Sequence, residues 1–300
     1  MHTLAEWLCI VALIATATHV QHVAVSLACM LLIAARQHAL LILMHEYAHH
    51  QFSRRHAWLN DMLGDALTAL PFFITVHGFR RNHMPHHQHV NTVADSNWIA
   101  AIKRPRYQFP KSKAQTYAEM VKHALGRYTL EELNRYTVDA GMATNLSPAS
   151  SRFRMVYAAL VLALLAVFDL WWTVLLYWLV PMATFLMGIL YVRDLGEHFG
   201  MPSQGIAGSR TVLSNWIGRL FICPYGVNYH AEHHLYPSVP FHRLASLHEV
   251  LRTDDYYRRH AVLAHGYLTG LVSQLAQSAS GPAHAASIAE AGIAASIDAS

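Results

Sequence analysis

Apolar residues in this chain are gathered into four long stretches with polar segments between them. The first two, residues 4–18 and 23–44, are separated only by a short polar turn. A second pair covers residues 155–168 and 170–192, with a single aspartate between the two stretches. Because a helix needs roughly 20 apolar residues to cross a bilayer, the pattern predicts four transmembrane helices arranged as two hairpins.

Composition indicates a membrane protein. Hydrophobic residues make up 54% of the 300 residues, only 13% are charged, and the mean hydropathy is +0.22. A soluble domain carries about 25% charged residues, so the chain is predicted to be an all-α integral membrane protein. The 3 cysteines are scattered and form no C-x-x-C pair, which favours neither a disulfide framework nor a thiolate metal site.

Charge placement predicts how the helices are oriented. Of the 22 Lys and Arg residues, 14 lie in residues 51–154, seven lie at or after Arg193, and none lies in a predicted hairpin turn. Under the positive-inside rule, the 51–154 segment and both chain ends are cytoplasmic. This rule and attraction to anionic membrane lipids account for the net charge of +4, so no nucleic-acid partner is expected.

The polar parts of the chain predict a cytoplasmic, histidine-rich helical cap. Residues 58–79 are moderately apolar and are typical of helices along the membrane interface, whereas residues 91–151 predict solvent-facing helices and loops. The Ala- and Ser-rich residues 276–300 predict a disordered tail, and residues 1–275 are expected to form one membrane domain. The first residues lack the basic region of a signal peptide, so the first apolar stretch is expected to be retained.

Three histidine clusters lie on the cytoplasmic side of the predicted helices. They are His45-Glu-Tyr-Ala-His49-His50, His83-Met-Pro-His86-His87 and His230-Ala-Glu-His233-His234. Positions i, i+3 and i+4 share one face of a helix, so the imidazoles of one cluster can converge on one or two ions. Neutral nitrogen ligands suit iron, zinc or copper, and there are more of them than one ion can use. The clusters therefore predict a site for more than one metal ion.

Other residues join the clusters at the same level. Asp194 and His198 lie one helical turn apart where the last predicted span ends, and Pro85 suggests that a helix begins inside the second cluster. Three glutamates flank histidines and are candidates either to orient an imidazole or to be solvated carboxylates; they are Glu46, Glu197 and Glu232. The histidines expected to bind metal are His45, His49, His83, His86, His87, His198, His230, His233 and His234.

In the order and spacing of these histidine boxes, the chain resembles the membrane fatty acid desaturase superfamily. Its boxes have the forms H-x-x-x-H, H-x-x-H-H and H-x-x-H-H, which the three clusters match, and the resemblance covers about residues 1–265. It implies a non-haem centre of two iron ions held by the nine histidines. In relatives, a histidine at the end of a late membrane helix is a ligand, which His198 matches. Asp194 stands where some relatives have an asparagine one turn before that histidine, which makes Asp194 a candidate residue of the metal site beside the three glutamates.

The resemblance also implies an oxidoreductase that uses O2. No side-chain acid or base can remove hydrogen from an unactivated C–H bond, so an oxygen-activating metal centre has to do it. The implied substrate is a fatty acyl or related lipid-like chain. The sequence has no fused cytochrome b5 motif and no flavin or nicotinamide fingerprint, so electrons are expected from a separate ferredoxin, rubredoxin or cytochrome b5. Desaturation is favoured because the boxes match the H-x-x-x-H, H-x-x-H-H, H-x-x-H-H set, whereas alkane hydroxylases of the superfamily have H-x-x-x-H-H in the second box. Hydroxylation or ketolation is the alternative, since His50 lets the first box here also read H-x-x-x-H-H.

Two functions of other classes stay open. Residues 45–49 also read H-E-x-x-H, the motif of zinc metalloproteases, although a protease leaves the other two clusters unexplained. A metal transporter would line its spans with ligands near the middle of the bilayer, whereas these clusters lie on one side. A soluble ferritin-like di-iron protein is excluded, because it needs two Glu-x-x-His units and only Glu46 to His49 fits.

Overall fold

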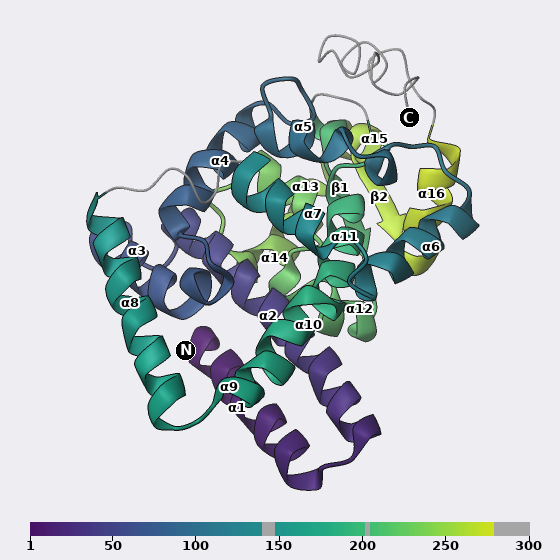
Figure 1. Ribbon diagram of the computed structural model, residues 1–300. Helices are drawn as coiled ribbons and strands as arrows, with labels where there is room; N and C mark the ends of the chain where they lie inside the picture. The colour runs from purple at the N-terminus through teal and green to yellow at the C-terminus, as the bar shows by residue number, and fades with distance from the viewer. Residues whose placement is uncertain (140–147, 202–204, 279–300) are drawn as a thin grey trace.

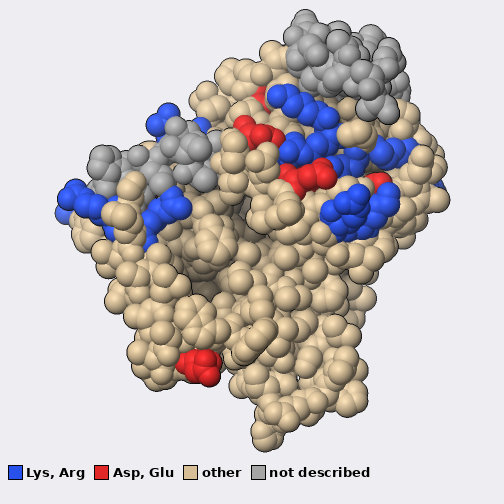
Figure 2. All heavy atoms as spheres, viewed as in Figure 1, with Lys and Arg blue, Asp and Glu red and all other residues tan. Residues whose placement is uncertain are grey.

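The computed structural model describes residues 1–139, 148–201 and 205–278. Figure 1 shows long helices at one end of the molecule and many short helices gathered at the other end. Charged residues are concentrated over the short helices, and very few lie on the face of the long ones (Figure 2). The long helices therefore form an apolar, membrane-facing part, and the short helices form the polar cap.

The membrane part consists of α1 (His2–Val20), α2 (Val23–Ala48), α8 (Pro148–Val167), α9 (Trp171–Val174), the π-helix η5 (Leu175–Leu179), α10 (Val180–Ala183) and α11 (Phe185–Glu197). The first part of the cap consists of α3 (Ala57–Gly64), η1 (Asp65–Ala69), η2 (Leu70–Phe72), α4 (Val76–Gln88), α5 (Ser96–Ile102), η3 (Pro105–Tyr107), α6 (Lys113–Ala124), α7 (Thr129–Asn134) and η4 (Arg135–Asp139). The second part consists of η6 (Ile206–Gly208), β1 (Arg210–Leu213), α12 (Trp216–Phe221), η7 (Pro224–Gly226), α13 (His230–Leu235), α14 (Phe241–Leu251), α15 (Asp255–His260), β2 (Val262–His265), η8 (Gly266–Leu271) and α16 (Val272–Gln277).

The predicted spans correspond to long apolar helices. Helices α1 and α2 and the continuous helix Trp171–Glu197 are each long and apolar enough to cross a membrane. The apolar stretch 155–168 lies in α8, which is not among those three, so its crossing stays a prediction. Figure 1 shows α8 standing apart from α1 and α2, and its Leu160 and Leu164 side chains are exposed, which suits contact with lipid.

The expected interface helices form a bent pair instead. Residues 57–72 and 76–88 are joined at an angle of 89° and together are apolar enough for a broken span or a re-entrant loop. Phe73, in a left-handed conformation (φ 64°), ends the first part. The Thr75 hydroxyl accepts a hydrogen bond from the Gly78 N–H (3.0 Å) and caps the second part. The bend aims α4, with its histidines, at the end of α2.

The cap is not purely helical, which corrects the all-α prediction. Strands β1 and β2 pair in parallel, with Arg210 opposite Val262 and Leu213 opposite His265. Their residues, Arg-Thr-Val-Leu and Val-Leu-Ala-His, are rich in the branched side chains that suit strands. The predicted tail lies outside the described residues from 279 onward, and α16 extends to Gln277.

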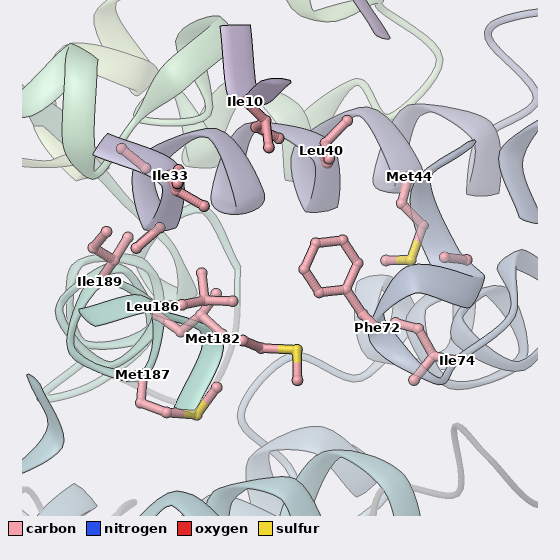
Figure 3. Packing of buried hydrophobic residues seen from close by; sticks show 14 of the residues in the cluster. Ile10, Ile33, Leu40, Met44, Phe72, Ile74, Met182, Leu186, Met187 and Ile189 are labelled. Atoms are coloured by element: carbon pink, nitrogen blue, oxygen red, sulfur yellow. The ribbon is translucent and has the colours of Figure 1, made fainter. Parts of the chain in front are cut away.

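Close contact between α2 and α11 positions the histidine-bearing ends of both helices. Ile33 and Leu40 of α2 and Leu186 of α11 are almost fully buried in one hydrophobic cluster, and Figure 3 shows them between the two helices. Gly188 lets α11 approach α6, because a Cβ at this position would lie 2.8 Å from that of Ala124. Such small residues allow close helix contact in membranes.

Candidate metal centre

The first histidine box lies at the C-terminal end of α2, where the second predicted span ends. His45 is in the last turn and His49 follows the helix as its C-cap. The last carbonyl groups of a helix have no hydrogen-bond partner within the helix. One of them, the carbonyl oxygen of Ala48, accepts a hydrogen bond from Nε of Arg80 (2.7 Å). Because Arg80 lies one turn before His83 on α4, the same hydrogen bond brings the second box to the first.

The second box lies within α4, not at its start, so the helix start predicted at Pro85 is wrong. The helix begins after its Thr75 cap and continues through Pro85 to Gln88. The proline removes one N–H donor close to the C-terminal end of the helix, so the lost hydrogen bond disrupts little of α4. Continuation through Pro85 keeps His83 and His87 on one face, at i and i+4.

Strand β1 brings the third box to His198. The strand begins just after Gly208, whose carbonyl oxygen lies 3.1 Å from Nδ1 of His198. Within the strand, the Val212 N–H donates to the Asn228 carbonyl (3.0 Å), two residues before α13 begins. The C-terminal end of α11 and the third box are thus held against one strand.

All nine predicted histidines meet in two adjacent groups. Within each group, one ring nitrogen per residue lies within 4.8 Å of those of the other members. The group of five consists of His45, His49, His83, His87 and His233, and the group of four consists of His86, His198, His230 and His234. Each of the last two boxes contributes to both groups. His50, in a left-handed turn (φ 56°), belongs to neither.

The tautomers of two of these histidines leave unshared electron pairs facing each other. The Nδ1–H of His86 donates to the Asp95 carboxylate (2.7 Å), and that of His198 donates to the Gly208 carbonyl. Both Nε2 atoms are then unprotonated, yet they lie 3.0 Å apart. Two ligands at right angles on a metal, with metal–nitrogen bonds of about 2.1 Å, lie about 3.0 Å apart. The geometry fits a cation between them.

Burial keeps the third box neutral. The pKa values of His230, His233 and His234 are well below the ordinary value of 6.5, first because burial disfavours the charged form and then because other imidazoles lie nearby. A histidine must be neutral to bind a metal. These three are therefore ready to act as ligands at neutral pH.

Two of the predicted glutamates lie beside an imidazole. An oxygen of Glu46 is 3.5 Å from Nδ1 of His45, and one of Glu197 is 3.6 Å from Nδ1 of His230. Both carboxylates also accept shorter hydrogen bonds: Glu46 from the backbone N–H of Phe241 (3.2 Å) and Glu197 from Arg193 (2.6 Å). They can orient the two rings electrostatically, since both distances exceed those of ordinary hydrogen bonds.

The other two predicted acidic residues bind elsewhere. The Glu232 carboxylate, fully buried, accepts hydrogen bonds from Thr211 and Tyr257 and contacts His248, which is outside the nine. Asp194 forms an ion pair with Arg135 (2.6 Å) and belongs to neither histidine group. Both carboxylates thus have partners in the cap, and a role of Glu232 in orienting an imidazole or of Asp194 at the metal stays a prediction.

Sequence reasoning missed Asp95. The residue is fully buried, and besides its contact with His86 it caps α5 by accepting from the N–H groups of Asn97 and Trp98, each at 3.1 Å. The sequence Asp95-Ser-Asn-Trp does signal a helix start, but nothing local shows that His86 lies beside the other carboxylate oxygen.

A cavity of about 140 Å³ reaches both histidine groups. One part is apolar, and Figure 3 shows Phe72 and Ile74 facing Met182 and Leu186 across it. The other part is lined by polar residues of α5, η4 and α11, and its histidines are His45, His83, His86, His198 and His230. In Figure 2 the surface is hollowed below the charged cap, between α8 and the α9–α11 helix. An apolar group in the cavity would contact the metal centre.

Residues 21–266 match the fatty acid desaturase family, so the chain belongs to this family of oxidoreductases. The matched segment includes all nine histidines. The chain is also similar to the dihydrorhizobitoxine desaturase of Bradyrhizobium elkanii, with 25% identity over 241 residues, which are 76% of this chain and 68% of that protein. The family match and this similarity both indicate an enzyme of the desaturase type.

Proposed function

We propose that the protein is an O2-dependent desaturase whose nine histidines hold two iron ions, one in each group. The observation that carries the proposal is the approach of His86 and His198 through two unprotonated nitrogens 3.0 Å apart, which only a cation between them stabilises. Imidazole ligands suit iron, zinc and copper. Iron is favoured because desaturation needs a redox-active metal and the desaturase family is generally di-iron.

The residues of this chain do the binding, orienting and water exclusion. Bound iron would supply the oxidising power of O2 that removal of hydrogen from an unactivated C–H bond requires. Asp95 and the Gly208 carbonyl hold His86 and His198 in the tautomer with a free Nε2. The apolar walls of the cavity hold a carbon chain beside the histidines and keep out water.

The proposed reaction is introduction of a double bond into a fatty acyl or related lipid-like chain. The name of the Bradyrhizobium elkanii relative supports desaturation. A hydroxylase or ketolase of the same family is the alternative, since a small shift of the substrate relative to the metal changes the fate of the reacting carbon. The position of His50 outside both groups supports desaturation over this alternative.

The remaining parts of the proposal concern partners and location. We infer that residues 1–275 form one multi-pass membrane domain with the metal centre and both chain ends in the cytoplasm, and that electrons come from a separate ferredoxin, rubredoxin or cytochrome b5. The orientation rests on the Lys and Arg residues between 51 and 154. Neither the protease nor the transporter is supported, because His45 and His49 share a group with three further histidines and all nine lie together at the ends of the spans.

Mass spectrometry with labelled oxygen tests the proposal. Lipids and metabolites are compared between hosts that express the wild-type protein and hosts that express the His86→Ala variant, each with an intact electron-donor system and with ¹⁸O2. The expected product is two hydrogens lighter than its precursor, contains no label, and is absent with the variant. Incorporation of one labelled oxygen would establish the hydroxylase alternative, and reconstituted activity with zinc instead of ferrous iron would contradict the di-iron centre.

A further inference from the structure

The polar part of the cavity contains an arginine whose guanidinium is mostly unused. Arg193 lines the cavity from α11, and its side chain is 17% exposed. Its Nε donates to Glu197 (2.6 Å). Among the described residues, neither Nη1 nor Nη2 has a hydrogen-bond partner. A guanidinium carries five N–H donors, and those left without a partner beside a cavity are available to a ligand.

A second side chain without a partner lies on the same cavity wall. Asn97 of α5 lines the cavity, and its side-chain oxygen is buried without a hydrogen bond. A buried amide that lacks partners is unfavourable by about 1–3 kcal/mol. The unpartnered atom is placed as an acceptor, and a half-turn of the amide puts the NH2 group there instead, where it can donate to an oxygen of a bound molecule.

The neighbouring charges leave Arg193 available. Asp194, the next residue, is already paired with Arg135 (2.6 Å) and also accepts a hydrogen bond from Tyr136 (2.9 Å). Glu197 meets Arg193 through Nε, so Nη1 and Nη2, which have no hydrogen-bond partner among the described residues, remain as a fork on a residue that lines the cavity. That fork matches the two oxygens of a carboxylate.

We propose that the substrate is a small free acid, whose carboxylate binds Nη1 and Nη2 of Arg193 and the amide of Asn97 while its carbon chain lies against Phe72 and Met182. This inference rests on the proposed function and names its substrate class. The cavity volume of about 140 Å³ is close to that of a cavity that holds benzene, roughly 150 Å³. A chain of about six carbons therefore fits within it.

The site also places the acid group close to the reacting carbons. Arg193 and His230 line the same cavity, and the same oxygen of Glu197 lies 2.6 Å from Nε of Arg193 and 3.6 Å from Nδ1 of His230. Asn97 lies two residues after Asp95, which holds His86. The carbons that lose hydrogen are therefore within a few bonds of the carboxylate.

Equilibrium binding tests this inference without requiring turnover. Labelled hexanoate and methyl hexanoate are titrated into the iron-loaded protein in nanodiscs, with empty nanodiscs subtracted. Hexanoate is expected to bind at least about 10-fold more tightly than its ester, because only the acid can form the bidentate, charge-assisted hydrogen bonds with Arg193 that add this affinity. Equal binding of acid and ester, or no binding of either, would overturn the inference.

Variants test which side chain causes the preference for hexanoate over its ester. Arg193→Gln should abolish the preference for the acid, and Asn97→Ala should reduce it severalfold. The matched control Arg219→Gln, in an exposed arginine of α12 outside this cavity, should keep it. If Arg193→Gln does not fold, as judged by iron content, then Arg193→Lys keeps the charge and loses the fork, and should still weaken the preference. A preference that persists in the folded Arg193 variant contradicts the inference. The proposed function fails separately, if no iron-dependent desaturation is found.

Discussion

His86 and His198 are 112 residues apart in the chain, yet their Nε2 atoms lie 3.0 Å from each other. Each ring is held by a hydrogen bond on its other nitrogen, His86 by Asp95 and His198 by the Gly208 carbonyl. Neither ring can turn its N–H toward the other without losing that bond. The pair is therefore preorganised for a metal ion and mutually repulsive without one.

Removing one ligand from the group of four should release one metal ion. In His86→Ala, the four-histidine group keeps three ligands, whereas the group of five stays complete. Anaerobic reconstitution followed by elemental analysis is expected to show a fall from two irons per chain to about one. His50→Ala is the control, because His50 lies in neither group. Equal iron contents in the two variants would argue against two separate groups.

The charge of Asp95 should matter more than its capping role. Asp95→Asn keeps the cap of α5 but weakens the hold on the His86 tautomer, and loss of such a partner typically costs 10–100-fold in metal affinity or activity. Asp254→Asn is a matched control, since Asp254 caps α15 in the same way through the Tyr257 N–H (2.8 Å). Iron affinity should fall only in the Asp95 variant. A similar loss in both variants would indicate an effect of helix capping alone.

Asp194 should contribute to stability and not to metal binding. Asp194→Asn removes one of the two carboxylate charges that pair with the buried Arg135. The ion pair between Arg135 and Glu132 (2.6 Å) remains. Breaking part of a buried ion pair should destabilise the protein by about 1–3 kcal/mol, seen as a lower temperature of thermal unfolding in nanodiscs. Iron content should stay at two per chain. Loss of one iron would instead make Asp194 a ligand.

The metal-free protein should become less stable in mild acid. The pKa values of His230, His233 and His234 are lowered in the folded state, so the unfolded state binds more protons below about pH 6.5. The free energy of unfolding should therefore decrease as the pH falls from 7.5 to 5.5. Thermal unfolding of chelator-treated protein measures this decrease. A higher unfolding temperature at the lower pH would show that these histidines are not buried as neutral groups.

Reporter fusions should establish the membrane topology. Fusions after Ser150 and after Leu275 are expected to report cytoplasm, and fusions near Gln21 and Asp169 the opposite side, as the distribution of Lys and Arg implies. The Asp169 fusion also tests α8. If it reports cytoplasm, then α8 does not cross the membrane and the second hairpin is wrong.

Local sequence signals were sufficient for much of the metal centre. Hydrophobic stretches predict α1, α2 and the Trp171–Glu197 helix because the length of an apolar stretch decides whether it can span a bilayer. The i, i+4 spacing within the boxes predicts that the two histidines of a pair share a helix face, as His83 and His87 do. Both signals act within one helix, so the sequence carries them completely.

Contacts between distant segments decided the rest. The division of nine histidines into five and four depends on how α2, α4, α11 and α13 are held together. Hydrogen bonds from Arg80 to the last turn of α2 and from Val212 to the Asn228 carbonyl are two of the contacts that do this. The contact of Asp95 with His86 and the pairing of Asp194 with Arg135 depend on the same arrangement. No spacing in the sequence encodes these contacts, because they result from which helix surfaces fit against one another. For the same reason, only the tertiary structure shows that Arg193, with two unused donors, lines the same cavity as the histidines.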